Sequence, residues 1–581
     1  MVITKEDLLL QRVYRWEREF ANGKFLTQPS GGQVREWTWG QAMNESRRMA
    51  AYLKAQRWER GSAVAILSKN SAWWIMADLA IWMAGYVSVP VYPSLRELTV
   101  RQILEHSRAK ACFFGEVERE TAPACGSPGV AWIALPNASS DIEVGWESLI
   151  EANTPIHGAP ERSADEIATI IYTSGTTGNP KGVMHRFHGF AQNAKALADL
   201  LGFSGRQRVL SYLPLAHIME RVGGEALSLR LATHMYFTEG IDTFLEDVAR
   251  ARPTIFLSVP RLLTKIQQGV FAKVSKSKLE RLMRIPAVNV YLRHRILRQL
   301  GFGRVGMAAC GGAPLPPEIF LWYRRLGLPL LEGYGMTETM ITHLPPLGAV
   351  RSGCVGPALD GVETKVSDAG ELLIRSEMNM TGYYREPELT RQAFTEDGFF
   401  RTGDLVVIEP DGQMRIVGRI KEQFKTSKGK YVVPAPIESK LMEHPAVEAC
   451  CLMGSGQPSP FAMIILADAV RKRCVDPEVR RDLERSLLAL LEGVNAELDP
   501  FERVSMIVVA DGPWTIGNGL ITPTLKIRRS VVEDQYRRLF DQWTDQQSGV
   551  VWESTPSIGA ASYMAGAGSS TRDSASPDQA K

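Results

Sequence analysis

The sequence predicts an α/β protein built on largely parallel sheets. Short apolar runs typical of strands alternate with helical stretches of ten or more residues over most of the chain. The strands predicted in the first half are Ala63–Leu67, Ala111–Phe114, Ala131–Leu135, Ile167–Tyr172, Val209–Leu213 and Thr254–Val259. Parallel neighbours need a crossover connection, usually a helix, so this alternation favours parallel pairing.

The length of the chain, and a change in the pattern of predicted secondary structure along it, predict more than one domain. At 581 residues the chain exceeds what one hydrophobic core organises. Around Gly403 the predicted strands become shorter and Asp-Gly turns occur, at Asp397-Gly398 and Asp411-Gly412. A second, smaller α/β unit follows, with predicted strands at Phe461–Leu466 and Val504–Val509.

Two apolar segments predict buried helices. The helix of the small unit places on one face Leu483, Leu487, Leu490, Leu491, Val494 and Leu498. The most apolar stretch, Ala72 to Val91, is interrupted by Asp78, Gly85 and Pro90. We therefore expect a buried helix leading into a strand there, rather than a transmembrane span.

Composition narrows the class of protein. Hydrophobic residues make up 45% and charged residues 23%, which is typical of a globular protein, and the net charge of +3 is too small to indicate nucleic acid binding. Seven cysteines without a CxxC pair, and no signal-peptide core at the N-terminus, favour a reduced, cytoplasmic location. From about Gln546 the chain is rich in Ser, Ala, Gly and Pro, so a disordered tail is predicted for 546–581.

The most informative segment is a glycine- and hydroxyl-rich loop that follows a predicted strand. It reads Tyr172-Thr173-Ser174-Gly175-Thr176-Thr177-Gly178-Asn179-Pro180-Lys181-Gly182. Glycines let backbone N–H groups approach an anion, hydroxyls donate hydrogen bonds, and a lysine adds positive charge. The segment therefore predicts a polyphosphate-binding loop, and it is not a Walker A loop because Lys181 is followed by glycine instead of Ser or Thr.

This loop resembles the phosphate loop of the adenylate-forming (AMP-binding) superfamily, and further segments resemble that family in the family's order, over roughly residues 25 to 540. They are Tyr212–His217, Gly311–Leu315, Glu332–Thr339, Arg401–Asp404, Gly418–Lys425 and Thr522–Lys526. The last has the form found in long-chain acyl-CoA synthetases, so the sequence is most similar to the bacterial-type long-chain fatty acyl-CoA synthetases.

The resemblance implies a set of site residues. Those implied to bind ATP are Thr173, Ser174, Gly175, Thr176, Thr177, Gly178, Lys181, Gly312, Ala313, Pro314, Gly333, Tyr334, Asp404 and Arg419. Those implied in catalysis are Thr337, Glu338, Lys421 and Lys526, with Thr176 and Glu338 as Mg²⁺ ligands and His217 beside the acyl substrate.

The residue types suit these roles. Tyr334 offers a flat apolar face for a purine, and the two oxygens of Asp404 can accept from both ribose hydroxyls. Glu338 is the hard oxygen ligand that Mg²⁺ prefers. A carboxylate that attacks ATP is repelled by the phosphates, and the positive charges of Lys181 and Lys526 offset that repulsion.

The resemblance also implies an architecture and a reaction. A large N-terminal domain of stacked α/β subdomains (1–419) holds the acyl and ATP sites, and a hinge at 420–421 connects it to a smaller, mobile C-terminal domain (422–545). A fatty carboxylate reacts with MgATP to give an acyl-adenylate and pyrophosphate, and the thiol of CoA then releases AMP. Lys526 acts in the first step, and rotation about Lys421 brings the Lys425–Tyr431 loop to the thiol.

Several alternatives remain open. Leu213–Arg221 and Thr522–Lys526 favour long chains, but Arg221 occupies the position where some long-chain relatives carry a gating tryptophan. Medium-chain or aromatic acids, transfer to a carrier protein, and a non-catalytic acyl- or nucleotide-binding role are therefore also considered. Taken singly, His217 also fits a core histidine, and Asp404 fits an ordinary turn.

A basic segment, Lys273–Arg298, has no role in these motifs. Its basic residues are Lys273, Lys276, Lys278, Arg281, Arg284, Arg293, Arg295 and Arg298, with Glu280 as the only acid. Three interpretations fit: peripheral contact with a membrane surface, a patch for CoA phosphates, or a surface helical hairpin with solvated side chains.

Overall fold

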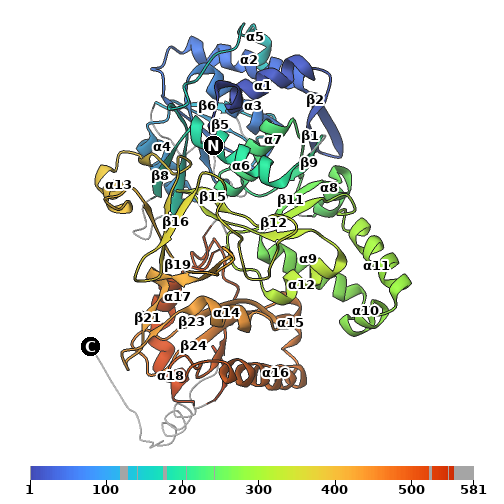
Figure 1. The fold of residues 1–581 in the computed structure, drawn as a ribbon, viewed down its shortest axis with the longest axis vertical. Coiled ribbons are helices and arrows are strands. Elements are labelled where there is room, and N and C mark those ends of the chain that lie inside the picture. The colour runs from blue at the N-terminus through green and yellow to red at the C-terminus, as the bar shows by residue number, and fades with distance from the viewer. Residues whose placement is uncertain are drawn as a thin grey trace, which may run out of the picture. The chain divides into compact units, whose positions relative to one another are not determined.

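The computed structural model describes residues 2–117, 129–139, 142–174, 180–203, 206–240, 242–522, 526–546 and 548–554. The chain forms two compact units (Figure 1). The first comprises Met1–Ile420 with Pro523–Lys526, and the second comprises Lys421–Thr522 with Ile527–Lys581. The predicted α/β class, with a larger and a smaller part, is confirmed.

One sheet of the first unit is parallel apart from an edge strand. Among the described residues it has the strand order β13-β12-β11-β9-β10-β1-β2, and only β2 runs antiparallel to its neighbour. The strands are β1 (Lys24–Ser30), β2 (Gln33–Thr38), β9 (Arg208–Ser211), β10 (His234–Phe237), β11 (Ile255–Ser258), β12 (Met307–Cys310) and β13 (Leu330–Glu332).

A second sheet of the same unit carries the predicted phosphate loop. Within the described ranges its strand order is β18-β8-β7-β4-β3-β5-β6, parallel from β7 to β6 and antiparallel at β7–β8 and β8–β18. The strands are β3 (Ala63–Leu67), β4 (Val87–Val91), β5 (Ala111–Phe114), β6 (Ala131–Ala134), β7 (Ile167–Ser174), β8 (Pro180–Arg186) and β18 (Gly382–Tyr383).

The apolar stretch 72–91 is a buried helix followed by a strand, as predicted. Helix α3 (Ala72–Ala84) starts where the Ser71 side chain accepts a hydrogen bond from the backbone N–H of Trp74, and it ends at Gly85 with φ of 92°. Its side chains belong to the largest core of the unit. Among the residues that the structure describes, none of the helices is both long and apolar enough to cross a membrane.

Helices and smaller sheets complete the first unit. The other helices are α1 (Leu9–Glu19), α2 (Trp39–Ala55), α4 (Glu97–Ser107), α5 (Trp146–Ala152), α6 (Phe187–Leu201), α7 (Leu227–Leu231), α8 (Phe244–Ala251), α9 (Pro260–Lys273), α10 (Lys276–Leu282), α11 (Pro286–Gln299), α12 (Pro317–Leu326), α13 (Pro387–Ala393) and the π-helical turn η3 (Glu220–Ala226). A ribbon joins β14 (Tyr334–Met336) to β15 (Met340–His343), and an antiparallel sheet contains β16 (Glu363–Val366), β17 (Glu371–Arg375), β19 (Phe400–Ile408) and β20 (Met414–Arg419).

The second unit packs helices on both faces of one sheet. The sheet consists of β23 (Val447–Met453), β24 (Phe461–Leu466), β25 (Ile507–Val509) and β26 (Val550–Trp552). The helices are α14 (Pro434–Leu441), α15 (Asp468–Arg473), α16 (Pro477–Ala496), α17 (Arg529–Tyr536) and α18 (Phe540–Thr544), and a separate ribbon pairs β21 (Phe424–Lys425) with β22 (Tyr431–Val432). The predicted face of α16 is confirmed, since Leu483, Leu487, Leu491 and Val494 are buried against the sheet.

The predicted start of the disordered tail at residue 546 is wrong. β26 extends the sheet by pairing in parallel with β25, and Val550 and Val551 are buried. The indole N–H of Trp552 donates a hydrogen bond to Glu484 on α16. Three residues with high β-propensity are enough to form an edge strand here, because they are buried on the sheet, although the residues around them are polar. Residues 555–581 lie outside the described part of the chain.

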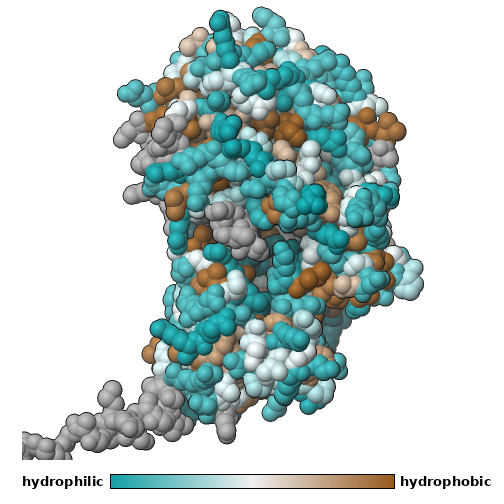
Figure 2. All heavy atoms as spheres, turned by 90° about the vertical axis from the view of Figure 1, so that its left-hand side faces the viewer, coloured by the Kyte–Doolittle hydropathy of each residue, from teal (hydrophilic) through white to brown (hydrophobic). Residues whose placement is uncertain are grey.

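The state of the cysteines and the polarity of the surface are those expected from the composition of the chain. The cysteines that the structure describes are free thiols. On the face drawn in Figure 2, the surface is mostly hydrophilic, and apolar residues form small separate groups.

Candidate nucleotide and acyl site

The predicted phosphate loop connects two antiparallel strands. β7 and β8 pair so that Thr173 lies opposite Lys181, and Ser174 is the last residue of β7. The described residues do not include Gly175, Thr176, Thr177 and Gly178. The prediction that Thr176 is a metal ligand therefore concerns a residue outside the described part of the chain. The register brings the hydroxyl residue at one end of the loop and the lysine at the other to the same end of the hairpin.

Tyr383 connects the lysine of this hairpin with the predicted magnesium ligand. Its hydroxyl donates a 2.9 Å hydrogen bond to Oε1 of Glu338, and Nζ of Lys181 lies 5.7 Å from the centre of its ring. Burial raises the pKa of Tyr383, and the neighbouring Glu338 carboxylate raises it further, so the phenol remains a donor. Sequence reasoning did not identify Tyr383, because it lies on β18, outside every recognised motif.

His185 fixes the backbone beside Glu338. The side chain is buried, and its Nε2 lies 2.6 Å from the carbonyl oxygen of Thr337. A carbonyl can only accept, so Nε2 carries the proton. Burial lowers the pKa of His185 to about 4, and the ring is therefore neutral near pH 7. The short bond joins β8 to the turn that carries Thr337 and Glu338.

Tyr334 and Asp404 lie in direct contact. The hydroxyl of Tyr334 donates a 2.6 Å hydrogen bond to Oδ2 of Asp404, and both side chains are buried. The register of β19 and β20 places Arg419 opposite Asp404, with Nε 2.7 Å from Oδ1. The Asp404 backbone N–H donates to the hydroxyl of Thr402. The carboxylate is thus held on both oxygens by residues from two different sheets.

Neighbouring parallel strands bring the two glycine segments together. Gly311 to Pro314 follow β12, and Gly333 follows β13, where its N–H donates to the carbonyl of Cys310. Gly312, Ala313 and Pro314 are exposed, and Gly312 has φ of 83°. The carboxyl ends of parallel strands are where open α/β sheets bind ligands, so the position agrees with a nucleotide site.

Asn70 braces the segment that contains His217. Its amide donates to the Leu213 carbonyl and to the Ser211 hydroxyl, and its oxygen accepts from the N–H of Leu215. Nδ1 of His217 accepts from the Met219 N–H at 3.2 Å. Burial lowers the pKa of His217 to about 4, so the imidazole is neutral near pH 7. Asn70 was another residue that the motifs did not indicate.

Arg221 occupies a sealed ionic cluster. Its guanidinium lies 2.9 Å from Asp78, contacts Glu225, and donates to the hydroxyl of Ser88. The ring centres of Trp74, Trp82 and Phe190 surround it at 5.1 to 5.6 Å. All three charged groups are almost completely buried, and burial raises the pKa of Glu225 well above its usual range. Arg221 is therefore part of the packed interior of the first unit.

Glu220, next to Arg221, is a buried carboxyl without a cationic partner among the described contacts. The Ser211 hydroxyl donates to its Oε1 at 2.6 Å. Burial raises the pKa of Glu220 to about 8. The group is therefore mostly protonated near pH 7.

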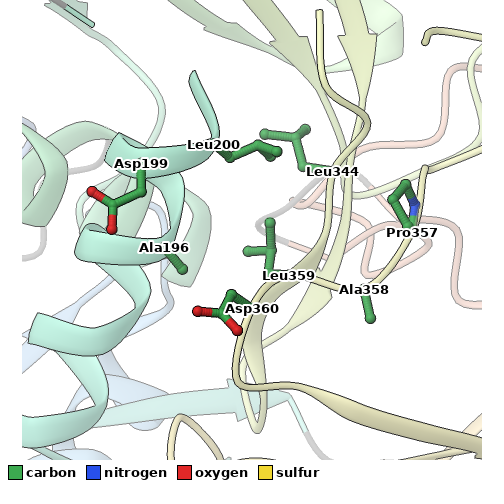
Figure 3. Close-up of a pocket in the computed structure, with 8 residues that line it drawn as sticks. All are labelled: Ala196, Asp199, Leu200, Leu344, Pro357, Ala358, Leu359 and Asp360. Carbon is green, nitrogen blue, oxygen red and sulfur yellow. The ribbon is translucent and has the colours of Figure 1, made fainter. Parts of the chain in front are cut away.

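A cavity of about 200 Å³ opens between α6 and the segment that follows β15 (Figure 3). Its walls are formed by Ala196, Asp199, Leu200, Leu344, Pro357, Ala358, Leu359 and Asp360. The carboxylates of Asp199 and Asp360 lie on one side, and the leucines extend into the cavity (Figure 3). None of the predicted site residues lines it, so it is separate from the nucleotide motifs.

The remaining predicted residues are exposed. Lys421 lies in a 3₁₀ turn, Ile420–Glu422, at the boundary between the two units. Lys526 is also exposed. No group of three or more His, Cys, Asp or Glu side chains suitable for a metal occurs in the described ranges. A single carboxylate such as Glu338 is nevertheless what nucleotide-bound Mg²⁺ requires, because phosphates and water supply its other ligands.

Family comparison assigns the chain to a class. A family description, "AMP-binding enzyme", matches residues 14–384, and another, "AMP-binding enzyme C-terminal domain", matches residues 421–547. The first match covers more than half of the chain. The protein therefore belongs to the AMP-binding enzyme family, which is the adenylate-forming superfamily that its motifs resemble.

Individual relatives fall within the same class. A protein described as long-chain-fatty-acid–CoA ligase FadD15 from Mycobacterium bovis is 28% identical over 590 residues, covering 92% of this chain and 96% of the relative. Long chain acyl-CoA synthetase 7, peroxisomal, from Arabidopsis thaliana is 29% identical over 581 residues, covering 88% of this chain and 82% of the relative.

Solved structures share the fold. The A domain of a carboxylic acid reductase from Segniliparus rugosus, in complex with AMP and a co-purified carboxylic acid, superposes with a TM-score of 0.78 at 22% identity, covering 93% of this chain and 94% of that one. ATP-bound MatB from Rhodopseudomonas palustris gives a TM-score of 0.73 at 23% identity, covering 92% and 99%.

Proposed function

We propose that this protein is an AMP-forming fatty acid–CoA ligase that prefers long-chain acids. In the first step, a carboxylate oxygen bonds to the α-phosphorus of ATP, and the bond to the β-phosphate breaks to release pyrophosphate. In the second step, the sulfur of CoA bonds to the acyl carbon, the bond to the phosphate oxygen breaks, and AMP leaves. The thiol proton passes to solvent.

The observation that carries the proposal is the buried pair of Tyr334 and Asp404, with Arg419 on the second carboxylate oxygen. A carboxylate held in place presents its remaining lone pairs to ribose hydroxyls without reorganising, which is the electrostatic preorganisation that catalytic sites require. Lys181, Glu338 and Tyr383 form a second group suited to phosphates and their cation.

The preference for a long chain rests on the relatives and on the Thr522–Lys526 segment. The two relatives described above are named as long-chain enzymes, although each is less than 30% identical. A medium-chain or aromatic acid, or a carrier protein as acceptor, is the second candidate, because structural neighbours include an anthranilate CoA ligase and an A-PCP didomain of a carboxylic acid reductase. It is tested by measuring AMP release for a series of acids from acetate to oleate, with and without CoA.

The proposal includes the roles that the motifs imply for Lys526 and for the segment that begins at Lys421. Lys526 contributes positive charge to the attacking carboxylate and the α-phosphate during adenylation. Rotation about Lys421 then replaces it with the Lys425–Tyr431 ribbon for thioester formation, since hinge motions typically use a few residues at element ends. Mg²⁺ would be held by Glu338 and the nucleotide phosphates, and it would neutralise charge on the pyrophosphate.

The test is AMP release measured across acids from acetate to oleate, each with and without CoA. We expect AMP and acyl-CoA to form in equal amounts, fastest with long chains, and pyrophosphate to appear with the acid alone. Equal rates for acetate and oleate would contradict the chain-length preference. ATP consumption that does not depend on the acid would contradict the function.

We also propose a cytoplasmic enzyme that contacts anionic membrane surfaces through Lys273–Arg298. Helix α11 has no buried residue, and its outward side carries Val290, Tyr291, Arg295 and Arg298. Ile285, Val290 and Tyr291 are each more than half exposed. Basic side chains beside exposed apolar ones are typical of surfaces that lie on anionic lipid.

Vesicle flotation tests this contact. Charge reversal at Lys276, Lys278 and Arg281 should release the protein from vesicles that contain phosphatidylserine, because each basic residue contributes about 1 kcal/mol near such a surface. The matched control reverses Lys472, Arg473 and Arg481 in the second unit. If both triple variants still bind the vesicles, membrane contact through this segment is excluded, and a raised KM for CoA would instead assign the segment to CoA phosphates.

A further inference from the structure

Arg529, which follows Lys526 closely in the chain, is anchored in the interior of the second unit. It is the first residue of α17, three positions after Lys526. Its Nη1 lies 2.7 Å from Oε1 of Glu438 on α14, and both side chains are 15% exposed. The same nitrogen donates to the carbonyl of Leu452 and lies 3.4 Å from the sulfur of Cys451.

Glu438 joins this arginine to β23. Its Oε1 also accepts a 2.6 Å hydrogen bond from the N–H of Leu452. Arg529 and Glu438 therefore hold the backbone of Leu452 from both its donor and its acceptor side. Burial alone would lower the pKa of Arg529, but the carboxylate of Glu438, together with the neighbouring Cys451 sulfur, raises it overall.

The residues on either side of the Lys526 segment are also paired with each other. Ile521 and Ile527 form an antiparallel bridge, and the N–H of Arg528 donates to the carbonyl of Leu520 at 2.8 Å. On the N-terminal side, Leu520 and Ile521 are buried in the core around Trp514 and Trp543. On the C-terminal side, the buried anchor is Arg529. The exposed Lys526 thus lies, along the chain, between two fixed points that both belong to the second unit.

We propose that Arg529, through its ion pair with Glu438, is a positioning residue for Lys526 and is required for adenylation but not for thioester formation. The inference rests on the proposed function, in which Lys526 acts only in the first half-reaction. A catalytic group misplaced by about 1 Å can lose on the order of a hundredfold in rate. The ribbon of β21 and β22 proposed for the second half-reaction has its own pairing, Phe424 with Val432 and Lys425 with Tyr431.

The test compares the two half-reactions in Arg529→Met, Arg529→Lys and Glu438→Gln. Pyrophosphate release with oleate and ATP should fall at least tenfold in Arg529→Met, less in Glu438→Gln, and least in Arg529→Lys, which keeps the charge. Conversion of supplied oleoyl-adenylate and CoA to oleoyl-CoA should remain within about twofold of the wild type. Leu487→Ala, a buried substitution in α16, is the matched control for lost stability and should affect neither half-reaction selectively.

A second measurement does not depend on activity. Hydrogen–deuterium exchange should increase in peptides covering 519–528 of Arg529→Met but not in peptides from α16. If Arg529→Met does not fold, Arg529→Lys and Glu438→Gln provide the same comparison. An equal loss of both half-reactions, or unchanged exchange at 519–528, would overturn the inference.

The outcomes also separate this inference from the proposed function. If the wild type releases pyrophosphate and Lys526→Ala does not, but Arg529→Met is unimpaired, only the positioning role of Arg529 is wrong. If the wild type releases no pyrophosphate with any acid, the proposed function fails and this inference fails with it.

Discussion

The hydroxyl of Tyr334 lies 2.6 Å from Oδ2 of Asp404, although the two residues are 70 positions apart in the chain. Tyr334 begins the β14–β15 ribbon, and Asp404 lies on β19 of the antiparallel sheet. Gly335, next to Tyr334, permits this approach of the ribbon strands, since a Cβ there would lie 2.1 Å from the Met340 carbonyl oxygen. The adenine platform and the ribose acceptor proposed here thus form one hydrogen-bonded unit.

Asp404→Ala should weaken ATP binding much more than fatty acid binding. The substitution removes two charge-assisted hydrogen bonds to ribose, each worth about 1.5–3 kcal/mol when desolvated. We expect the KM for ATP to rise by at least about tenfold, since about 1.4 kcal/mol is a factor of ten. The KM for the acid at saturating ATP should barely change. Similar losses for both substrates would mean that the substitution only destabilises the fold.

Lys526→Ala should separate the two half-reactions. Pyrophosphate release should be abolished, because the positive charge beside the attacking carboxylate is lost. Conversion of supplied acyl-adenylate to thioester should continue at a near-normal rate. Loss of both activities in a variant with unchanged circular dichroism would count against the assigned role.

Lys421→Pro should have the opposite effect. Proline fixes φ near −65° and removes a backbone donor, so it should restrict rotation at the Ile420–Glu422 turn. Acyl-adenylate should accumulate while thioester production falls, as followed by chromatography of a single turnover. Undiminished thioester synthesis would show that rotation at this residue is not required.

Arg221→Ala should strongly destabilise the first unit. Removing one partner of a buried ion pair typically costs about 3–5 kcal/mol, because the remaining carboxylate of Asp78 loses its counter-charge. Arg391→Ala, which breaks an exposed pair with Glu388, is the control and should change the free energy of unfolding far less, because solvent screens exposed pairs. Urea denaturation of both variants measures the difference, and equal midpoints would contradict the account of the cluster.

Glu220 should make stability depend on pH. Its pKa is about 8 in the folded protein and near 4.5 when unfolded, so the folded state binds more protons between these values. This contribution to stability is fully present below pH 4.5 and is lost as the pH rises towards 8, by up to about 1.4 kcal/mol per pH unit. Glu220→Gln should remove that slope. The measurement is Tm as a function of pH, from pH 5 to 8, for the wild type and for Glu220→Gln. If the two curves have the same slope, Glu220 is ionised in the native state and this prediction is wrong.

Sequence patterns predicted the fold well where strands are buried and poorly where side chains compete for the backbone. β3, β5 and β24 have the predicted bounds because they are apolar throughout. The strand predicted at Val504–Val509 begins only at Ile507, since the Asn495 side chain binds both the N–H and the carbonyl of Val504. The strand predicted to reach Leu213 ends at Ser211, where Asn70 takes the Leu213 carbonyl.

The candidate site shows the same limit. The motifs indicated Lys181, Glu338, Tyr334 and Asp404, because each belongs to a contiguous pattern of residues. Tyr383, His185 and Asn70, which hold those residues or their neighbours, belong to no local pattern. Their roles arise only from contacts across 45 to 152 positions of sequence, and periodicity and spacing do not encode such contacts.

The most direct test of the central claim is the stoichiometry of a reaction with ATP labelled at the α-phosphate, oleate and CoA. One AMP should form for each oleoyl-CoA, with pyrophosphate as the other product, and labelled oleoyl-adenylate should form when CoA is omitted. ADP as the nucleotide product, or AMP released at the same rate without the acid, would contradict it.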